Sequence, residues 1–158
     1  MSARTPATRY LEAHQVAYTL HPYDYEAHGG TRVSAQALGV DEHQVVKTLV
    51  FEDEAKKPFL ILMHGDREVS TKALARALGV KQVGPCKPEL AQRHTGYLVG
   101  GTSPFGTKKT LQVCCERSIT SLEKIYINAG GRGLLCCINP SELLRLLQPT
   151  LVDCAAQE

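Results

Sequence analysis

The sequence predicts a single mixed α/β domain that spans residues 1–158. The length of 158 residues suits one substantial core but is short for two. Hydrophobic residues make up 43% of the chain and charged residues 22%, fractions typical of a soluble globular protein. Helix-like and strand-like segments alternate along the chain, and no interior segment resembles a linker. These three observations favour one α/β core.

No apolar run approaches the roughly 20 residues that a membrane-spanning helix needs. The N-terminus leads into a polar amphipathic stretch, whereas a signal peptide would need an apolar core. We therefore expect a cytoplasmic protein that does not contact a membrane.

The first part of the chain predicts a helix, a strand, a loop and a second helix. Thr5 and Pro6 are typical of an N-cap and a first helical turn. Apolar residues alternate over 16–20 as in a strand, and the stretch 23–31 contains the glycine pair typical of a loop. A short helix is expected at 35–38, because the glycine that follows would end it.

A hairpin and further alternating elements follow. Strands over 45–52 and 59–64 are separated by a short turn, so they should pair. The same signals predict helices over 72–78, capped by Ser70 or Thr71, and from 88 to Gly96, then strands over 97–99, 111–116, 125–128 and 134–138. A last helix is expected after Asn139-Pro140-Ser141-Glu142, which offers an N-cap, an N1 proline and a capping-box glutamate.

Charge is distributed unevenly, although the chain carries a net charge of only +2. Residues 67–109 contain eight basic and two acidic side chains, a net of +6, whereas the rest of the chain carries ten basic and fourteen acidic side chains. A basic segment of this kind suits a phosphate backbone. Solvated helix faces also collect lysine and arginine, so both interpretations stay open.

The six cysteines do not have metal-site spacing. They are Cys86, Cys154 and the adjacent pairs 114–115 and 136–137, with no C-x-x-C motif among them. Each adjacent pair lies in an apolar strand-like run, where neighbours point to opposite faces, so one cysteine of each pair should face the core. We expect reduced structural thiols, no metal and no cofactor.

Two glycine-containing loops and one lysine are the candidates for chemistry. The loop 100–109 allows close approach to a ligand and ends in two lysines, but it lacks the P-loop pattern, and a plain strand-connecting turn is the alternative. Lys47 shares the apolar face of its strand with Val45 and Leu49, so it either lies at an edge or lines a pocket. The turn 128–133 carries Arg132, and it is either a bare hairpin or an anion-binding turn.

No hydrolase triad is apparent. The sequence has neither a G-x-S-x-G elbow nor an H-E-x-x-H motif. The six histidines lie in unrelated contexts, and none stands out as a catalytic base: His14, His21, His28, His43, His64 and His94. A hydrolase of this sequence would therefore need its substrate to supply part of the machinery.

Three segments together resemble the YbaK/EbsC family. They are the strand Val46-Lys47-Thr48-Leu49, the long run 91–109 that includes Tyr97-Leu98-Val99-Gly100-Gly101-Thr102-Ser103-Pro104-Phe105-Gly106, and the segment 125–134. The family comprises Cys-tRNA(Pro) deacylases related to the editing domain of prolyl-tRNA synthetases. The resemblance implies a curved, partly barrel-like mixed β-sheet flanked by helices. It also implies a pocket for the aminoacylated 3′ end of tRNA, with prolyl-tRNA synthetase as a possible partner.

The same resemblance implies roles for individual residues. Lys47 matches the essential lysine, and the family is understood to use no protein nucleophile, because the thiol of the substrate attacks the ester and leaves as a thiolactone. The implied substrate-binding residues are Tyr23, Thr48, Gly100, Gly101, Thr102, Ser103, Asn128 and Arg132.

The turn 126–133 departs from the usual family pattern Y-V-S-G-G-K-R-G. Asn128 replaces a pocket serine, Ala129 a glycine and Gly131 a lysine. The amino acid that is removed is therefore open between cysteine, alanine and serine. A noncatalytic module that binds the tRNA 3′ end or a nucleotide is an alternative of another class, and a thiol-redox protein is a third.

Overall fold

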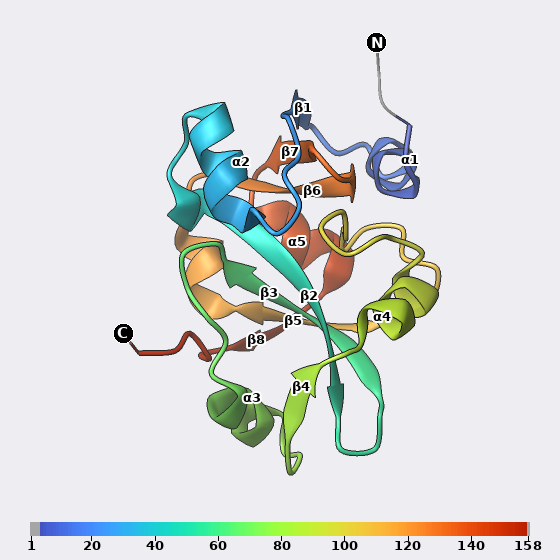
Figure 1. Ribbon diagram of the computed structural model, residues 1–158, viewed down its shortest axis with the longest axis vertical. Helices are drawn as coiled ribbons and strands as arrows, with labels where there is room; N and C mark the ends of the chain where they lie inside the picture. Colours follow the sequence, from blue (N-terminus) through green and yellow to red (C-terminus); the bar gives the residue numbers. More distant parts are fainter. Residues whose placement is uncertain (1–3, 158) are drawn as a thin grey trace.

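One twisted mixed sheet organises the computed structural model, which describes residues 4–157 (Figure 1). Its strands are β1 (Thr19–Pro22), β2 (Val45–Asp53), β3 (Pro58–His64), β4 (Val83–Pro85), β5 (Gln112–Glu116), β6 (Ile125–Gly131), β7 (Leu134–Ile138) and β8 (Thr150–Val152). The order is β1-β7-β6-β2-β3-β5-β8, with β4 paired to β2. Within the described residues β1 and β8 are the ends of this order, so the sheet stays open.

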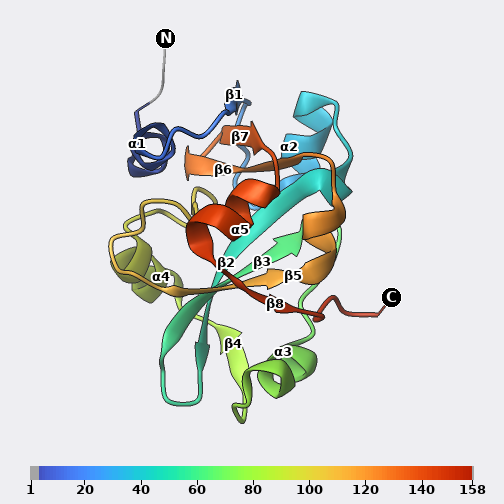
Figure 2. The same ribbon diagram turned by 180° about the vertical axis from the view of Figure 1, so that it is seen from behind.

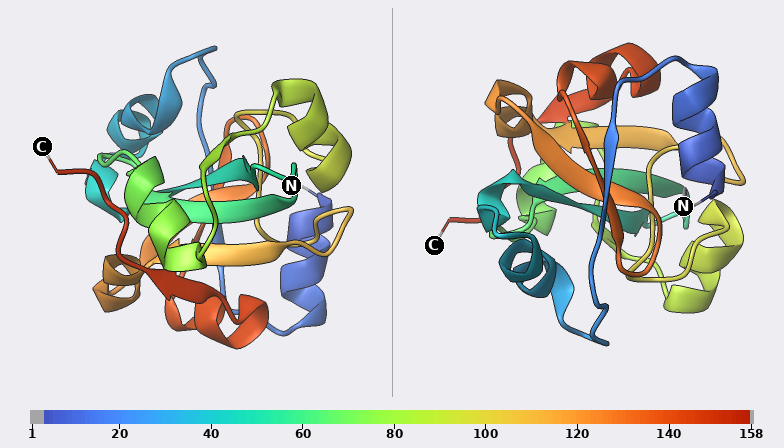
Figure 3. Two further views of the ribbon diagram at one scale, coloured as in Figure 1. Left: turned by 90° about the horizontal axis from the view of Figure 1, so that it is seen from below. Right: turned by 90° about the horizontal axis from the view of Figure 1, so that it is seen from above.

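Helices cover both faces of the sheet. They are α1 (Pro6–Ala13), α2 (Gly30–Leu38), α3 (Thr71–Leu78), α4 (Pro88–Thr95) and α5 (Ser141–Leu147), with the 3₁₀ turns η1 (Glu42–Gln44) and η2 (Arg117–Ser121). Figure 2 shows α5 over the face opposite to the one that α2 covers in Figure 1. Figure 3 shows α1 and α4 together on one side of the molecule and α2 on the other. None of the described helices is long and apolar enough to cross a bilayer.

The central strand β2 alternates between two cores. Val46 and Val50 pack with Leu11, Ile127 and Leu143 in the largest buried cluster. Val45 and Phe51 face the other side, where they join smaller clusters beneath α2 and α3. Because the sheet is covered on both faces, its strands bury residues on both.

The adjacent cysteines also show that strands of this sheet are buried on both faces. Cys114 and Cys115 are both buried, in different clusters, so the expectation that only one of this pair faces a core is wrong. The pair 136–137 has one buried and one partly exposed member. All six cysteines are free thiols, and burial raises the pKa of Cys115 to about 12, so that side chain behaves as a small apolar residue.

Most predicted elements are confirmed. The hairpin of β2 and β3 forms in antiparallel register from Val46↔His64 to Glu52↔Pro58. Ser70 caps α3 by accepting from the Ala73 N–H, and the side chain of Asn139 accepts from the Ser141 N–H at the start of α5.

Several expectations are wrong at the level of single elements. Residues 97–99 are not a strand, because they form a bend in which the Gly101 N–H donates to the Leu98 carbonyl. The helix α2 starts at Gly30, five residues before the expected start, and it has no side-chain cap that would mark it. Glu142 pairs with Arg145 and forms no capping box.

The first strand and two short strands also differ from expectation. β1 begins at Thr19, where it pairs with Cys137, rather than at residue 16. The short strands β4 and β8 were not expected. Each has only three residues, too few for an alternating pattern.

The loop between α4 and β5 packs tightly on α1, and this contact can be tested at Gly106. Gly106 has φ +67°, and a Cβ there would lie 2.5 Å from the Pro6 carbonyl oxygen. Gly79 has a similar φ of +70° but open space around it. We expect Gly79→Ala to lower the free energy of unfolding by about 1–2 kcal/mol from backbone strain alone. Gly106→Ala should lower the free energy of unfolding by about 1–3 kcal/mol more, because its Cβ would also clash with the Pro6 carbonyl. Equal losses in urea unfolding of the two variants would contradict this packing.

Candidate functional site

Strand β2 loses its neighbour halfway along one edge, and the candidate site lies there. On that edge β2 pairs with β6 only at Val45 and Val46, and with β4 only from Phe51 onward. The Val50 carbonyl, which points to this edge, accepts from the Cys86 N–H at 2.9 Å. Backbone groups alternate in direction along a strand, so those of Thr48 point to the same edge, where no described strand pairs with them. The edge between residues 47 and 50 is therefore open.

A cavity of about 750 Å³ opens at this edge. It lies between β2, the loop that leads into α2, the start of α4 and the glycine loop after α4. Of the predicted site residues, it is lined by Tyr23, Lys47, Thr48, Gly100, Thr102, Asn128 and Arg132. Gly101 and Ser103 do not line it. Segments far apart in the sequence thus meet at one gap in the sheet.

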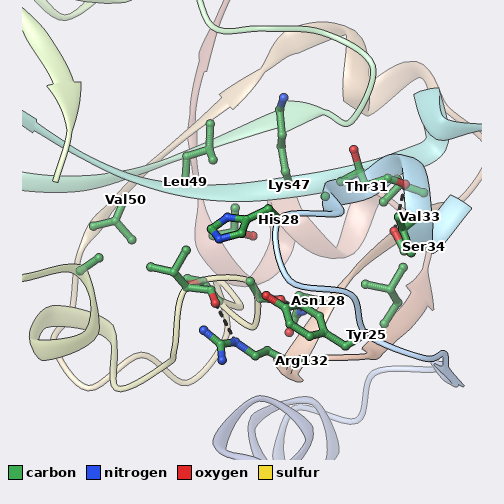
Figure 4. Close-up of a pocket in the computed structure, with 18 of the residues that line it drawn as sticks. Tyr25, His28, Thr31, Val33, Ser34, Lys47, Leu49, Val50, Asn128 and Arg132 are labelled. Atoms are coloured by element: carbon green, nitrogen blue, oxygen red, sulfur yellow. Dashed lines mark hydrogen bonds between the residues drawn. The ribbon is translucent and has the colours of Figure 1, made fainter. Parts of the chain in front are cut away.

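Lys47 is one wall of the cavity. Its side chain is 19% exposed, and its Nζ lies 3.6 Å from Oε1 of Glu68, whose side chain is 87% exposed. Such an exposed partner gives a weak ion pair that a ligand can displace. Figure 4 shows Lys47 extending to one side of β2 and Asn128 and Arg132 lying on the other. Of the two interpretations open from the sequence, the structure supports a pocket-lining lysine.

Thr48 lines the cavity, but its side-chain oxygen does not face open space. The Oγ1 is buried, and no described residue hydrogen-bonds it. A buried hydroxyl without a partner is unfavourable by about 1–3 kcal/mol. What Thr48 offers to a ligand is therefore its backbone at the open edge.

The glycine loop uses its residues in two ways. Gly100 has φ +91°, and a Cβ there would lie 2.7 Å from the Tyr25 hydroxyl, so only glycine fits. A Cβ at Gly101 would lie 2.9 Å from the Arg132 nitrogen, which shows that Gly101 packs on the β6–β7 turn. The buried Ser103 hydroxyl accepts from the Phe105 N–H. Gly100 faces the cavity, whereas Gly101 and Ser103 hold the loop in place.

Asn128 connects this loop to the β6–β7 turn. Its Nδ2 donates to the carbonyls of Gly100 (3.3 Å) and Gly131 (3.1 Å). Its Oδ1 accepts from the N–H groups of Gly130 (2.6 Å) and Gly131 (3.1 Å). The amide has two donors and two acceptor lone pairs, so backbone groups use its full capacity. Asn128 therefore shapes the cavity without a spare polar group.

Tyr25 and Arg132 form the rim. The Arg132 Nε donates to the Val99 carbonyl at 3.0 Å, and its guanidinium lies 5.3 Å from the Tyr25 ring centroid. Tyr23 lies deeper, and burial raises the pKa of its phenol, which therefore stays neutral. Sequence reasoning missed Tyr25 and His28, both of which line the cavity. No pattern marks them, because they lie in an irregular loop.

The cavity walls offer no activated nucleophile. The Ser34 hydroxyl donates to the Thr31 carbonyl, and that of Thr31 donates to Glu42. Burial, reinforced by Glu52, raises the pKa of Cys86 to about 11, so this thiol stays protonated. Among the described residues, no serine, threonine or cysteine that lines the cavity hydrogen-bonds a histidine.

One metal-like cluster lies outside the cavity. The ligand atoms of His43, His64 and Asp66 fall within 4.8 Å of one another. The two imidazoles stack at 3.8 Å with planes 7° apart, so their in-plane lone pairs do not converge on one point. Both ring nitrogens of His64 are also hydrogen-bonded, to the His43 carbonyl and to Ser118. This arrangement does not form a ready metal centre.

Comparison with known proteins identifies the class. The model of the aminoacyl-tRNA editing domain matches residues 29–146, so the chain belongs to this family. A relative named "Putative Cys-tRNA(Pro)/Cys-tRNA(Cys) deacylase EbsC", from Enterococcus faecalis, is 29% identical over 98% of this chain and 95% of its own length. A proline–tRNA ligase of Limosilactobacillus fermentum is 26% identical over 63% of this chain, which corresponds to 18% of the ligase.

Solved structures show the same fold. A structure titled as hypothetical protein APE2540 superposes with a TM-score of 0.87 at 22% identity, over 96% of this chain and all of that one. A structure titled as a "putative trans-editing enzyme for prolyl tRNA synthetase" superposes with a TM-score of 0.83 at 24% identity, over 99% of this chain and all of that one. The mixed sheet flanked by helices, expected from the family resemblance, is confirmed.

The connection through Asn128 can be tested with Asn128→Asp. The substitution places a carboxylate oxygen against the Gly100 and Gly131 carbonyls, which need a donor. We expect the free energy of unfolding to fall by about 3 kcal/mol. Asn139→Asp is the matched control, because Asn139 is exposed and its Oδ1 accepts from the Ser141 N–H, a hydrogen bond that an aspartate oxygen accepts equally well. Similar stabilities of the two variants in urea would contradict the role of Asn128.

Proposed function

We propose that this chain is a trans-editing aminoacyl-tRNA deacylase that removes cysteine from Cys-tRNA(Pro) in the cytoplasm. The observation that carries the proposal is the open edge of β2, where Lys47, Thr48 and Gly100 surround a cavity without an activated nucleophile. Membership of the editing family supports deacylation as the reaction. The name of the enterococcal relative supports cysteine as the amino acid.

The open edge suits an aminoacyl ester. The free backbone N–H and carbonyl of Thr48 offer one donor and one acceptor at the strand edge. The aminoacyl group of a substrate can hydrogen-bond to them in the way that a residue of a neighbouring strand would. Lys47 supplies a positive charge beside that edge. Negative charge that develops on the ester oxygen during attack would be stabilised there.

The chemistry requires a nucleophile, and in this proposal the substrate supplies it. The cysteine sulfur attacks the carbonyl carbon, a carbon–sulfur bond forms, and the bond from that carbon to the ribose oxygen breaks. The proton of the thiol ends on the ribose oxygen, so the products are tRNA and a cyclic thiolactone. Holding sulfur and carbonyl carbon close together accounts for the acceleration.

Asn128 gives a substrate serine no hydrogen bond that would favour it over cysteine. A serine hydroxyl needs hydrogen-bond partners when it is buried, whereas a thiol is a weak hydrogen-bonding group. The Asn128 amide has no capacity left for a substrate hydroxyl. Alanine would fit the same surroundings but brings no nucleophile.

The proposed partners are the acceptor end of tRNA and prolyl-tRNA synthetase. Part of the basic segment lies at the end of α4, where the Lys109 Nζ is 3.2 Å from His94 Nδ1. Lys108 is tied to the same helix end through its N–H, which donates to the Thr95 carbonyl. The first turn of α4 lines the cavity, and lysines at the other end of this helix suit the phosphates next to a tRNA 3′ end. The match to part of proline–tRNA ligases supports the link to that enzyme.

The proposal predicts that Lys47→Ala strongly lowers the catalytic efficiency. We expect kcat/KM for Cys-tRNA(Pro) to fall about 10²–10³-fold, because a charge that stabilises the transition state is removed. Lys57→Ala is the control, since Lys57 lies in the turn after β2 and does not line the cavity. It should keep wild-type activity.

Three outcomes of this experiment are informative. If the wild type shows no turnover and Lys47→Ala only binds uncharged tRNA more weakly, the result would support a noncatalytic binding module. Faster wild-type turnover of Ala-tRNA(Pro) or Ser-tRNA(Pro) would keep the deacylase and change its substrate. Equal activity of Lys47→Ala and Lys57→Ala would contradict the role of Lys47.

A further inference from the structure

His28 stands apart from the other five histidines. Each of them has a ring hydrogen bond: His14 to Tyr10, His21 to Thr19, His43 to Asp66, His64 to Ser118 and His94 to Lys109. The His28 ring has no hydrogen bond to any residue that the structure describes. It is exposed, and it is the one histidine among the residues that line the cavity.

A tight turn places this imidazole in the site. The Gly29 N–H donates to the Glu26 carbonyl at 3.0 Å, so residues 26–29 form a turn with His28 in its third position. His28 has φ +62°, the left-handed region that the third position of a type II turn occupies. Position 29 has room only for glycine, because a Cβ there would lie 2.7 Å from Val33 Cγ2.

The backbone gives no reason for a histidine at this position. Glycine and asparagine adopt a positive φ at least as easily, and a left-handed backbone at a non-glycine residue is often found at a functional site. Figure 4 shows the His28 ring between β2 and Asn128, among the labelled residues of the cavity. A free imidazole is thus held in the wall of the cavity by a turn that does not need it.

We propose that His28 is the general acid–base residue of the deacylation reaction; this rests on the function proposed above. One imidazole nitrogen takes the proton from the thiol of the substrate as the carbon–sulfur bond forms. The imidazolium then gives this proton to the ribose oxygen as its bond to the carbonyl carbon breaks. Atoms and charges balance, and no further reactant is needed.

Among the groups that face the cavity, an imidazole suits this task best. The other titratable side chains in its lining are Tyr23, Tyr25, Glu26, Lys47, Cys86 and Arg132. Imidazole is the side chain whose charge ordinarily changes between pH 5 and 8, so it both accepts and returns a proton at neutral pH.

The test compares His28→Asn and His28→Gly with wild type. Both substitutions fit the turn, so the melting temperature should be equal or slightly higher. We expect kcat for Cys-tRNA(Pro) to fall about 100-fold or more, with KM nearly unchanged, because a general base contributes about 10²–10⁴-fold. Gln15→Gly is the control: Gln15 has φ +58°, is exposed and lies outside the cavity. It should keep full activity.

Rescue by free imidazole gives a second readout that a structural role would not change. In His28→Gly the ring is absent, so imidazole added to the solution should restore part of the lost kcat. An unchanged kcat in both variants, or a lost kcat that imidazole does not restore, would overturn the proposal while leaving deacylation intact. A wild-type protein that deacylates nothing would instead refute the function on which it rests.

Discussion

Strand β2 has a full partner on one edge and a gap on the other, and the site depends on that gap. The parallel pairing with β6 ends after Val46, and the pairing with β4 begins only at Phe51. An unpaired strand edge inside a protein is unfavourable, because its polar groups have lost water. Here the sheet leaves a cavity at that edge in place of another strand, so Lys47 and Thr48 stay accessible within a rigid scaffold.

The walls of the cavity are held by backbone contacts. Gly100 and Gly101 allow the loop after α4 to approach Tyr25 and the β6–β7 turn, and the Asn128 amide joins the two segments. In the proposed reaction these walls hold the ester in position. The proposal requires such walls, because in it no residue of the protein attacks the ester.

Sequence reasoning recovered elements with strong local signals. The β2–β3 hairpin and the capped helix α3 follow from alternation, turn residues and Ser70. It failed where tertiary contacts decide, as at residues 97–99, where the apolar residues bend around Gly101 and form no strand. Strand alternation and glycine spacing mark Lys47 and Gly100 as candidates, and the roles expected for them come from the family resemblance. His28 could not be identified from the sequence, because only the fold brings its irregular loop to the cavity.

In the proposed reaction the substrate supplies the nucleophile at the open edge of β2. Single-turnover deacylation of Cys-tRNA(Pro) and Ser-tRNA(Pro), which differ in one sulfur or oxygen atom, tests this when the small product is identified by mass spectrometry. We expect rapid release of the cyclic thiolactone from the cysteine substrate and much slower loss of serine. Equal rates, with free cysteine as the first product, would contradict this reaction.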